Sequence, residues 1–490
     1  MIDPLEFETI SGNSYFWDGE LGLVFPSSSV MNATLKEIAN QNSLSRDELV
    51  SKLKHFKNEE IAYCYDIVKK YDKIRPNAPS QIPQNFPPES IKKFLLRYGL
   101  TQLVLNVTED CNFRCKYCVF SGAYEHVRTH SKKYMNFNVA KKAIDCYFSL
   151  FNEGKKYNPL RAATIGFYGG EPLLNFYLIK KSVEYIERTY NQTKIVYSMT
   201  TNSSLLDKEK ADWLMQHNFK LSISLDGPEE EHDRNRVYAS GKGTFKDVMK
   251  NVSYIMNKEY DRITSLPIYD WKSDLFRLEK FFAREDVPPI AAVNPVVDRG
   301  HYYEQFAYED FLKYIEQRKE AEKYYYKNYD RITRRKSVFH CLFGETAARA
   351  IFDVVPLSSP PKLLPFTGTC MPGRKIFVDV DGNLHMCQVI NYFFPIGTVD
   401  EGLNLELISK RLSEYFQHTD KCPNCKMKKS CSYCYYRLTN GNKIVYTSEL
   451  CKGAERKTAE SLAKALATAE QNPEVVEMLE VYLKIKNISR

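Results

Sequence analysis

The stretch "TEDCNFRCKYC" (108–118) places three cysteines, Cys111, Cys115 and Cys118, within eight residues. Thiolates this close together can bind a metal, but a closed structural zinc site takes four ligands, usually from paired C-x2-C motifs. A [4Fe–4S] cluster held by only three thiolates leaves one iron atom open to a small molecule. The three cysteines could therefore belong to a zinc site completed by a ligand elsewhere or to a site whose fourth position is left open.

Strand-like and helix-like segments alternate from about residue 100 to residue 300, which predicts an α/β fold with a parallel barrel or partial barrel. The expected strands are 102–107, 163–168, 194–199, 220–225, 263–269 and 290–296. The cysteine stretch follows the first strand, "GGEP" (169–172) the second, "TTNSS" (200–204) the third and "DGP" (226–228) the fourth. Because loops at the carboxyl ends of parallel strands build the active site of such barrels, these four stretches are expected to meet.

The C-x3-C-x2-C spacing, with Tyr117 before the last cysteine, resembles the signature of radical SAM enzymes. The resemblance implies a partial (β/α)6 radical SAM barrel in which S-adenosylmethionine (SAM) binds the open iron through its amino and carboxylate groups. An electron from the cluster then cleaves SAM to a 5′-deoxyadenosyl radical, which removes an unactivated hydrogen. An electron donor such as flavodoxin or ferredoxin is the expected partner for this step.

The same resemblance implies a set of SAM contacts. "GGEP" matches the element that contacts the amino group of SAM, where Gly169 and Gly170 allow close approach of the backbone and Glu171 accepts from the ammonium. Arg236, in "HDRNR" (232–236), is the candidate partner of the SAM carboxylate. Side chains at the ends of the third and fourth strands are further candidates: Ser198, Thr200, Asn202 and Ser224. Ordinary turn chemistry or a surface charge is the alternative for each of them taken singly.

A second group of cysteines lies near the C-terminus: Cys370, Cys387, Cys422, Cys425, Cys431, Cys434 and Cys451. With Gly382 five residues before Cys387, this order resembles the cysteine-rich SPASM domain, which holds two auxiliary [4Fe–4S] clusters. The resemblance implies that one of them is held by Cys422, Cys425, Cys431 and Cys451. It assigns Cys370, Cys387 and Cys434 to the other, so three clusters are expected in the chain.

The cysteine pattern departs from that of the SPASM domain at two points. Only two residues separate Cys431 from Cys434, where three are usual, and no cysteine lies shortly before Cys370. Either Cys341, 29 residues upstream, completes that cluster, or one of its irons is open to a substrate thiolate. Two zinc knuckles are the alternative for the whole region.

Six segments are expected along the chain: an N-terminal unit (1–75), a proline-rich linker (76–94), the barrel (95–300), a helical bridging region (301–365), the SPASM domain (366–455) and a C-terminal helix (456–490). In the N-terminal unit, "SYFWDGELGLVFP" predicts two strands around a turn at Asp18-Gly19. Two amphipathic helices follow, the second with Ser45 as N-cap and Glu48 at capping-box spacing. A hairpin followed by helices indicates a winged-helix-like module.

The composition is that of a soluble globular protein. Of its 490 residues 43% are hydrophobic and 27% charged, and no apolar run approaches the roughly 20 residues that span a bilayer. The start, "MIDPLEFETI", lacks the features of a signal peptide, so a cytoplasmic location without a membrane partner is expected. In that compartment the thirteen cysteines are not expected to form disulfides. Cys64 and Cys146 lie in helical apolar patterns and are predicted to be small core residues.

The formal net charge of +8 raises the question of a nucleic-acid partner. Two clusters held by four thiolates and one held by three would lower that charge to about +3. Basic runs such as "RITRRK" (331–336) are then better explained as solvated helix faces. No nucleic-acid partner is expected.

The segment "LKEIANQNSLSRDELVSKL" (35–53) is similar to the helix-turn-helix part of PqqD-like recognition elements, which bind the leader of a ribosomally synthesised and post-translationally modified peptide (RiPP) as an added strand. Together with the radical SAM and SPASM resemblances, it implies a maturase of a small cysteine-containing precursor peptide. "GTCMPGRKIFVDVDGNLHMC" (368–387) most resembles maturases of sactipeptides and ranthipeptides, which join a cysteine sulfur to carbon in a thioether.

Other functions are open at this level. The chain could form a carbon–carbon crosslink or epimerise a residue in a peptide. It could also be an anaerobic sulfatase maturase, which oxidises Ser or Cys to formylglycine; that family has Asp directly after the cysteine of its G-x4-C element, where this sequence has Gln388. A binding protein with purely structural clusters would not cleave SAM. The sequence does not identify the precursor, its acceptor residue or a catalytic side chain.

Overall fold

The computed structural model describes residues 4–19, 23–41, 44–72, 86–125, 127–297, 300–329, 332–345, 371–389, 392–417, 422, 425–427, 431, 438–441 and 443–472. Two of the predicted ligands, Cys370 and Cys434, lie outside the described residues. Among the helices of the described part, none is both long and apolar enough to cross a lipid bilayer.

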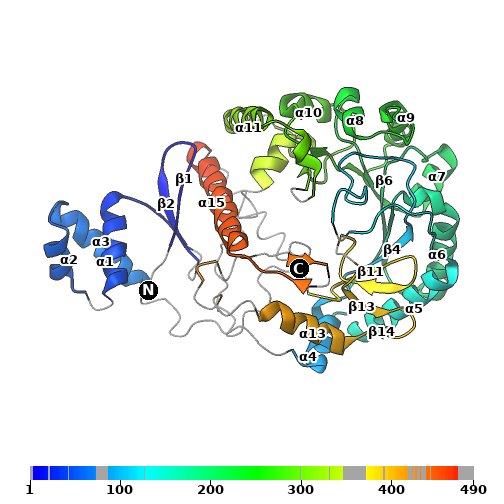
Figure 1. Cartoon of the computed structure of the whole chain (residues 1–490), viewed down its shortest axis with the longest axis horizontal. Coiled ribbons are helices and arrows are strands. Elements are labelled where there is room, and N and C mark those ends of the chain that lie inside the picture. The colour runs from blue at the N-terminus through cyan, green and yellow to red at the C-terminus, as the bar shows by residue number, and fades with distance from the viewer. Residues whose placement is uncertain are drawn as a thin grey trace.

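The N-terminal unit is a three-stranded antiparallel sheet followed by three helices (Figure 1). The strands β1 (Leu5–Glu8), β2 (Ser14–Asp18) and β3 (Leu23–Pro26) lie in that order, and the helices are α1 (Ser29–Asn40), α2 (Arg46–Lys52) and α3 (Asn58–Asp72). The hairpin expected from the sequence is β2 and β3, whereas β1 was not predicted. The capping box of α2 is confirmed, because Ser45 Oγ accepts from Glu48 N and Glu48 Oε2 accepts from Ser45 N.

One face of this sheet and the three helices enclose a core of their own. Phe16 from β2 packs there with Leu35, Leu49 and Ile61 from the helices. Cys64 is 4% exposed within it, so its prediction as a core residue is confirmed.

The barrel is built from five parallel strands in the order β4-β5-β6-β7-β8. Their bounds are β4 (Gln102–Thr108), β5 (Ala163–Gly169), β6 (Ile195–Thr201), β7 (Lys220–Ile223) and β8 (Ile263–Ser265). Helices follow the strands and cover their outer side (Figure 1): α5 (Phe137–Gly154), η1 (Pro172–Asn175), α6 (Phe176–Thr189), α7 (Lys208–Gln216), α8 (Glu229–Asn235), α9 (Phe245–Met256) and α10 (Leu275–Phe282). The first four predicted strands and the α/β class are confirmed. Cys146, on α5, is half-buried rather than a core residue.

The prediction of one regular strand in each of the segments 263–269 and 290–296 is wrong. Segment 263–269 divides into β8 and the short β9 (Ile268–Tyr269), because Pro267 between them has no N–H to donate to a ladder. Segment 290–296 contributes one isolated bridge, between Ser265 and Ile290, and the short β10 (Asn294–Pro295), which pairs in parallel with β9. The barrel therefore closes less regularly than six equal β/α units would.

The C-terminal cysteine region extends the barrel sheet. β11 (Lys375–Val378) pairs in parallel with β4, and β12 (Asn383–His385), β13 (Pro395–Thr398) and β14 (Gly402–Leu403) follow antiparallel, giving a mixed sheet of nine strands. Gly382, in the turn between β11 and β12, has φ +94, a conformation that favours glycine. Ile376 and Leu384 pack in the same core as the barrel residue Leu105. The boundary expected near residue 366 is therefore no boundary of sheet or core.

Helices pack against this extension. α4 (Pro88–Tyr98) contacts α13 (Leu405–Phe416), and Pro at the start of α4 fits a first helical turn. The linker expected at 76–94 thus ends before Pro88, and residues 76–85 of it lie outside the described part of the chain.

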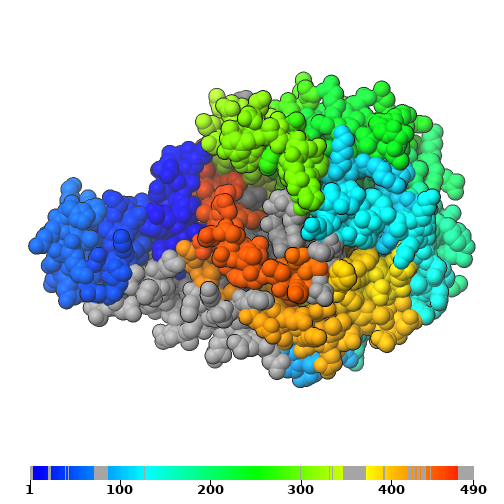
Figure 2. Space-filling view, in the orientation of Figure 1, coloured from blue at the N-terminus to red at the C-terminus, as the bar shows by residue number. Residues whose placement is uncertain are grey.

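The expected bridging region (301–365) is helical as far as residue 345, with η2 (Tyr302–Gln305), α11 (Tyr308–Lys327), η4 (Arg334–Lys336) and the π-helical η5 (His340–Gly344). The short strands β15 (Thr439–Asn440) and β16 (Lys443–Ile444) then lead to α15 (Ser448–Gln471). This last helix begins before the expected position 456 and carries Cys451; of the expected range, 473–490 is not described. Figure 2 shows α15 between the N-terminal unit and the barrel.

Candidate active site

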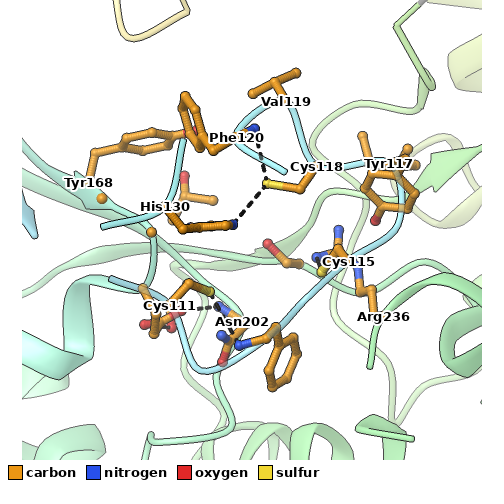
Figure 3. A pocket seen from close by; sticks show the side chains of 18 of the residues that line it. Cys111, Cys115, Tyr117, Cys118, Val119, Phe120, His130, Tyr168, Asn202 and Arg236 are labelled. Atoms are coloured by element: carbon orange, nitrogen blue, oxygen red, sulfur yellow. Dashed lines mark hydrogen bonds between the residues drawn. The ribbon is translucent and has the colours of Figure 1, made fainter. Parts of the chain in front are cut away.

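Three of the four stretches that follow the barrel strands, the cysteine stretch, "GGEP" and "TTNSS", line one cavity of about 250 Å³, whereas residues 226–228 do not line it (Figure 3). Its lining includes Cys111, Cys115, Cys118, Gly169, Gly170, Glu171, Thr200, Asn202, Ser224 and Arg236. Ser198 does not line the cavity. Ser198 lies in the middle of β6, which extends to Thr201. Ser198 and Thr200 are two residues apart and share a face of the strand, but Thr200 is nearer to the end of the strand where the cavity lies. A contact of Ser198 with SAM is not supported by this position.

Hydrogen bonds to residues 235–237 hold one side of the cysteine loop. Arg114 N donates to Val237 O at 2.7 Å, and Lys116 N donates to Asn235 O at 3.0 Å. These backbone contacts join the loop to the segment that carries Arg236, so the cysteines and this guanidinium are positioned together.

The "GGEP" segment holds the other side of the loop. Gly170 N donates to Thr108 O at 2.9 Å, and Glu171 N donates to Asp110 O at 2.8 Å. A Cβ at Gly170 would lie 2.2 Å from Asp110 O and 2.9 Å from Cys111 Cβ, which is closer than such atoms approach. Gly170 is therefore required by contact with the cysteine loop itself, in addition to lining the cavity.

The three thiols face the cavity, and each is near a hydrogen-bond donor (Figure 3). The backbone amides of Phe113 and Phe120 lie 3.4 Å from the Sγ atoms of Cys111 and Cys118, and Arg236 Nη1 lies 3.9 Å from Cys115 Sγ. His130 Nε2, which the sequence did not single out, is 3.7 Å from Cys118 Sγ. Donors at these positions stabilise sulfur in its anionic form.

Burial raises the pKa of all three thiols, that of Cys115 to about 12. A bound cation is therefore needed to keep them as thiolates at neutral pH. Within the part of the chain that the structure describes, no three His, Cys, Asp or Glu side chains are placed to hold a single metal ion. Three thiols around one cavity are nevertheless the ligand set of a [4Fe–4S] cluster that has one iron without a protein ligand.

Glu171 is a buried carboxylate at the cavity wall. Its Oε1 accepts from Thr201 Oγ1 at 2.7 Å and from Leu173 N at 3.0 Å, and its Oε2 accepts from Asn202 N at 2.7 Å. Burial raises the pKa of Glu171 to about 7, although these hydrogen bonds favour the charged form. An ammonium group bound beside it would favour the charged form further.

Arg236 is held by a buried ion pair. Its Nε donates to Asp226 Oδ2 at 2.9 Å, and the Tyr117 hydroxyl donates to the same oxygen at 2.5 Å. The other oxygen, Asp226 Oδ1, accepts from Ile268 N at 3.0 Å. Burial alone would lower the pKa of Arg236, but the charges of Asp226, Tyr117 and Cys115 raise it well above its usual value. The sequence analysis did not assign Asp226 or the hydroxyl of Tyr117 to the site.

His232 supports this ion pair from behind and is fully buried. Asp226 N lies 3.3 Å from His232 Nδ1, which must accept, and His232 Nε2 then donates to Thr244 Oγ1 at 3.0 Å. Thr244 Oγ1 in turn donates to Arg236 O at 2.9 Å. Protonation of Nδ1 would break the contact with Asp226 N, and burial lowers the pKa of His232 to about 3.

We expect this histidine to make folding pH-dependent. Its folded pKa is lowered to about 3 from 6.5, so the unfolded chain binds the extra proton and stability falls as the pH drops below about 6.5. The loss from His232 alone should be about 1.5 kcal/mol between pH 6.5 and 5. Urea unfolding of the full chain at several pH values measures it, and a His232→Gln variant, which keeps an acceptor and a donor, should lack that component. An unchanged pH slope in this variant would contradict the assignment.

The auxiliary cysteines lie in two places. Cys387 follows β12, which belongs to the same sheet as the barrel strands, and does not line the cavity. Cys422, Cys425, Cys431 and Cys451 belong to a second region, where Cys425 N donates to Cys422 O at 3.1 Å. Burial, and to a lesser degree the charge of Cys451, raises the pKa of Cys425. Cys341 lies in η5 beside the barrel core, and its role as a ligand stays a prediction.

Comparison with known proteins identifies the central part of the chain. Residues 105–270 match the sequence model of the radical SAM superfamily. The uncharacterized protein MJ0907 of Methanocaldococcus jannaschii is 35% identical over 183 residues, so that the match spans 37% of this chain but only 57% of that protein. A cysteine-type anaerobic sulfatase-maturating enzyme of Clostridium novyi is 26% identical over 357 residues, covering 68% of this chain and 87% of that enzyme.

The solved structure of native anSMEcpe with bound AdoMet (SAM) and Cp18Cys peptide has the same fold. It superposes with a TM-score of 0.55 at 19% sequence identity, covering 78% of this chain and 99% of that one. Together with the match over 105–270, this confirms a radical SAM domain, with homology to maturases of this kind. Such a domain implies a [4Fe–4S] cluster and SAM, which the cavity and its cysteines fit.

Proposed function

We propose that this chain, whose residues 105–270 form a radical SAM domain, is an enzyme that modifies a peptide by joining a cysteine sulfur to carbon. The observation that carries the proposal is the cavity at the carboxyl ends of β4–β7, which three thiols, a buried carboxylate and a buried guanidinium line together. When bound, the cluster and SAM supply a 5′-deoxyadenosyl radical, which takes a hydrogen atom from the substrate.

Different residues of the chain would hold the cluster and SAM. Cys111, Cys115 and Cys118 would hold the cluster, and their loop is fixed on both sides by backbone hydrogen bonds. Glu171, held by three donors, presents a carboxylate to the amino group of SAM. Arg236 has its Nε occupied by Asp226, and its remaining N–H groups lie at the cavity for the SAM carboxylate. Thr200, Asn202 and Ser224 provide further polar contacts there.

Thioether formation removes two hydrogens from the peptide. One leaves carbon as a hydrogen atom and becomes part of 5′-deoxyadenosine. The other would leave the cysteine thiol as a proton, and an auxiliary cluster, when bound, would supply an acceptor for the electron left after the sulfur–carbon bond forms. Cys387 follows β12, a strand of the sheet that also contains the barrel strands, and it would supply one ligand of such a cluster.

The N-terminal unit is the proposed binding site for the leader of the precursor. Within the described residues the sheet order is β1-β2-β3, with α15 flanking β1, so β3 is the edge strand on the side away from this helix. An extended peptide can add to such an edge as a further strand.

Formylglycine formation is the second candidate, because the sulfatase-maturating enzyme of Clostridium novyi aligns over 87% of its length. The residue after Cys387 speaks against it. Gln388 Oε1 accepts from Lys375 Nζ at 2.8 Å, and an amide in this position cannot take a proton as an Asp would.

Anaerobic coexpression with a small cysteine-containing precursor tests the proposal. We expect 5′-deoxyadenosine to form with SAM and a reductant, and the precursor to lose two hydrogens per link while its cysteine becomes resistant to alkylation. Loss of sulfur from a sulfatase-derived peptide, with no change in the precursor, would establish the second candidate instead. No SAM cleavage with either peptide would refute both.

A further inference from the structure

The N-terminal sheet has a second buried face, directed away from its own helices. Leu5, Phe7 and Trp17 are 7%, 7% and 1% exposed, and they form an apolar cluster with Met427, Leu462 and Ala465. Cys425 and Cys431 pack against the same cluster. One face of the sheet therefore covers the N-terminal helices, and the other covers α15 and two of the predicted auxiliary ligands.

The two backbones of this interface come close together at Gly19, directly after β2. A Cβ there would lie 1.8 Å from the carbonyl oxygen of Lys426, so the two backbones touch. Lys426 lies between Cys425 and Met427 in the chain. The φ angle of Gly19 is not in the left-handed region, so contact with Lys426, and not backbone conformation, requires glycine here.

α15 holds the same face of the sheet at a second point. Glu470, near the end of this helix, accepts from the Tyr15 hydroxyl at 2.7 Å and from Thr9 Oγ1 at 3.0 Å. Cys451 lies on the first turn of the same helix. The element that carries one predicted ligand thus also holds the N-terminal sheet.

We propose that the N-terminal sheet is a wall over the predicted cluster site, the region that carries Cys425, Cys431 and Cys451, and that it holds these cysteines in place and shields them from water and oxidants. The assignment of an iron–sulfur cluster to this site rests on the proposed function. The packing of the sheet against these cysteines is independent of it. Val24, which pairs with Trp17 across β2 and β3, packs against the same cluster. The β3 edge offered to the leader is therefore held at a fixed position relative to these cysteines.

A Gly19→Ala variant of the full chain separates the wall from Lys426 without touching a ligand. In anaerobically loaded protein we expect part of the iron to be released to a chelator at least about tenfold faster, because local opening exposes this site. The SAM-dependent electron paramagnetic resonance signal of the other cluster should not change. Gly453→Ala is the matched control, since a Cβ at this position of α15 meets nothing within 4 Å.

Alkylation of the metal-free chain separates failure of the wall from failure of the cluster assignment. Cys425 and Cys431 should react several-fold faster in Gly19→Ala than in wild type or Gly453→Ala, as measured by mass spectrometry. Equal rates would overturn the proposal. Faster alkylation without faster iron release would support the role of the sheet as a wall, but it would refute the assignment of an iron–sulfur cluster to these cysteines. Leu462→Ala, which loosens the interface from α15, should give the same increase while hydrogen exchange in α1–α3 stays protected.

Discussion

Replacing Cys115 by Ala is expected to abolish SAM cleavage. Cys115 is one of three thiols around the cavity, and with two protein ligands left the cluster loses the arrangement that leaves a single iron open. The rate of 5′-deoxyadenosine formation should fall by at least about 10²-fold, the upper end of what loss of an outer-shell partner alone costs. Chromatography of the products, with iron content and the electron paramagnetic resonance spectrum with and without SAM, measures the effect.

Cys146→Ala is the matched control for this variant. Cys146 is a half-buried cysteine of α5 with no ligand role in the proposal, and it should retain its iron and its activity. Cleavage of SAM by Cys115→Ala at the wild-type rate would show that these cysteines do not hold the reactive cluster. The assignment of these cysteines to an iron–sulfur cluster would also be contradicted if anaerobically prepared wild-type protein contained zinc in place of iron.

The convergence of the cysteine loop with "GGEP", "TTNSS" and "DGP" could be predicted, because each follows a strand and the carboxyl ends of parallel strands share one edge. The local pattern predicts that a strand is followed by chemically active residues better than it predicts the residue at which the strand ends. Ser198 shows this: the expected strand ended at residue 199, but β6 extends to Thr201, so Ser198 lies deeper than the cavity.

Contacts between segments far apart in the chain could not be predicted from the local sequence pattern. β11 pairs with β4 although some 270 residues separate them, and nothing in the short apolar run 375–378 distinguishes a barrel strand from a strand of a separate domain. Gly19 illustrates the same limit, since it read as a turn residue and its contact with Lys426 depends on how two ends of the chain meet.

Asp226 was missed for a related reason. In "DGP" an aspartate is an ordinary turn residue, and its place in the site depends on Tyr117 and Arg236, which only the fold brings within hydrogen-bond distance. The one available sign was the position of the motif after a barrel strand. A residue that positions another is therefore harder to find from sequence than a ligand with a fixed spacing.

Asp226→Asn is expected to have the second large effect, on both stability and SAM binding. It leaves Arg236 as a buried cation without a counter-charge, and breaking a buried pair by removing one partner costs about 3–5 kcal/mol. An amide also cannot accept from Tyr117, Arg236 and Ile268 in the same geometry, because one of its two ends is a donor. Denaturant unfolding of the metal-free chain measures the first effect.

The same change should weaken SAM binding by at least about tenfold, because Asp226 no longer holds Arg236 in its place at the cavity lining. Titration of SAM into cluster-loaded protein measures this. Asp212→Asn is the control, since Tyr254 donates to Asp212 in a similar but exposed pair and should contribute under about 1 kcal/mol. In a double-mutant cycle, Asp226→Asn and Arg236→Gln should cost less together than the sum of the two alone, as expected for one coupled unit. Additive losses would mean that Asp226 does not act through Arg236.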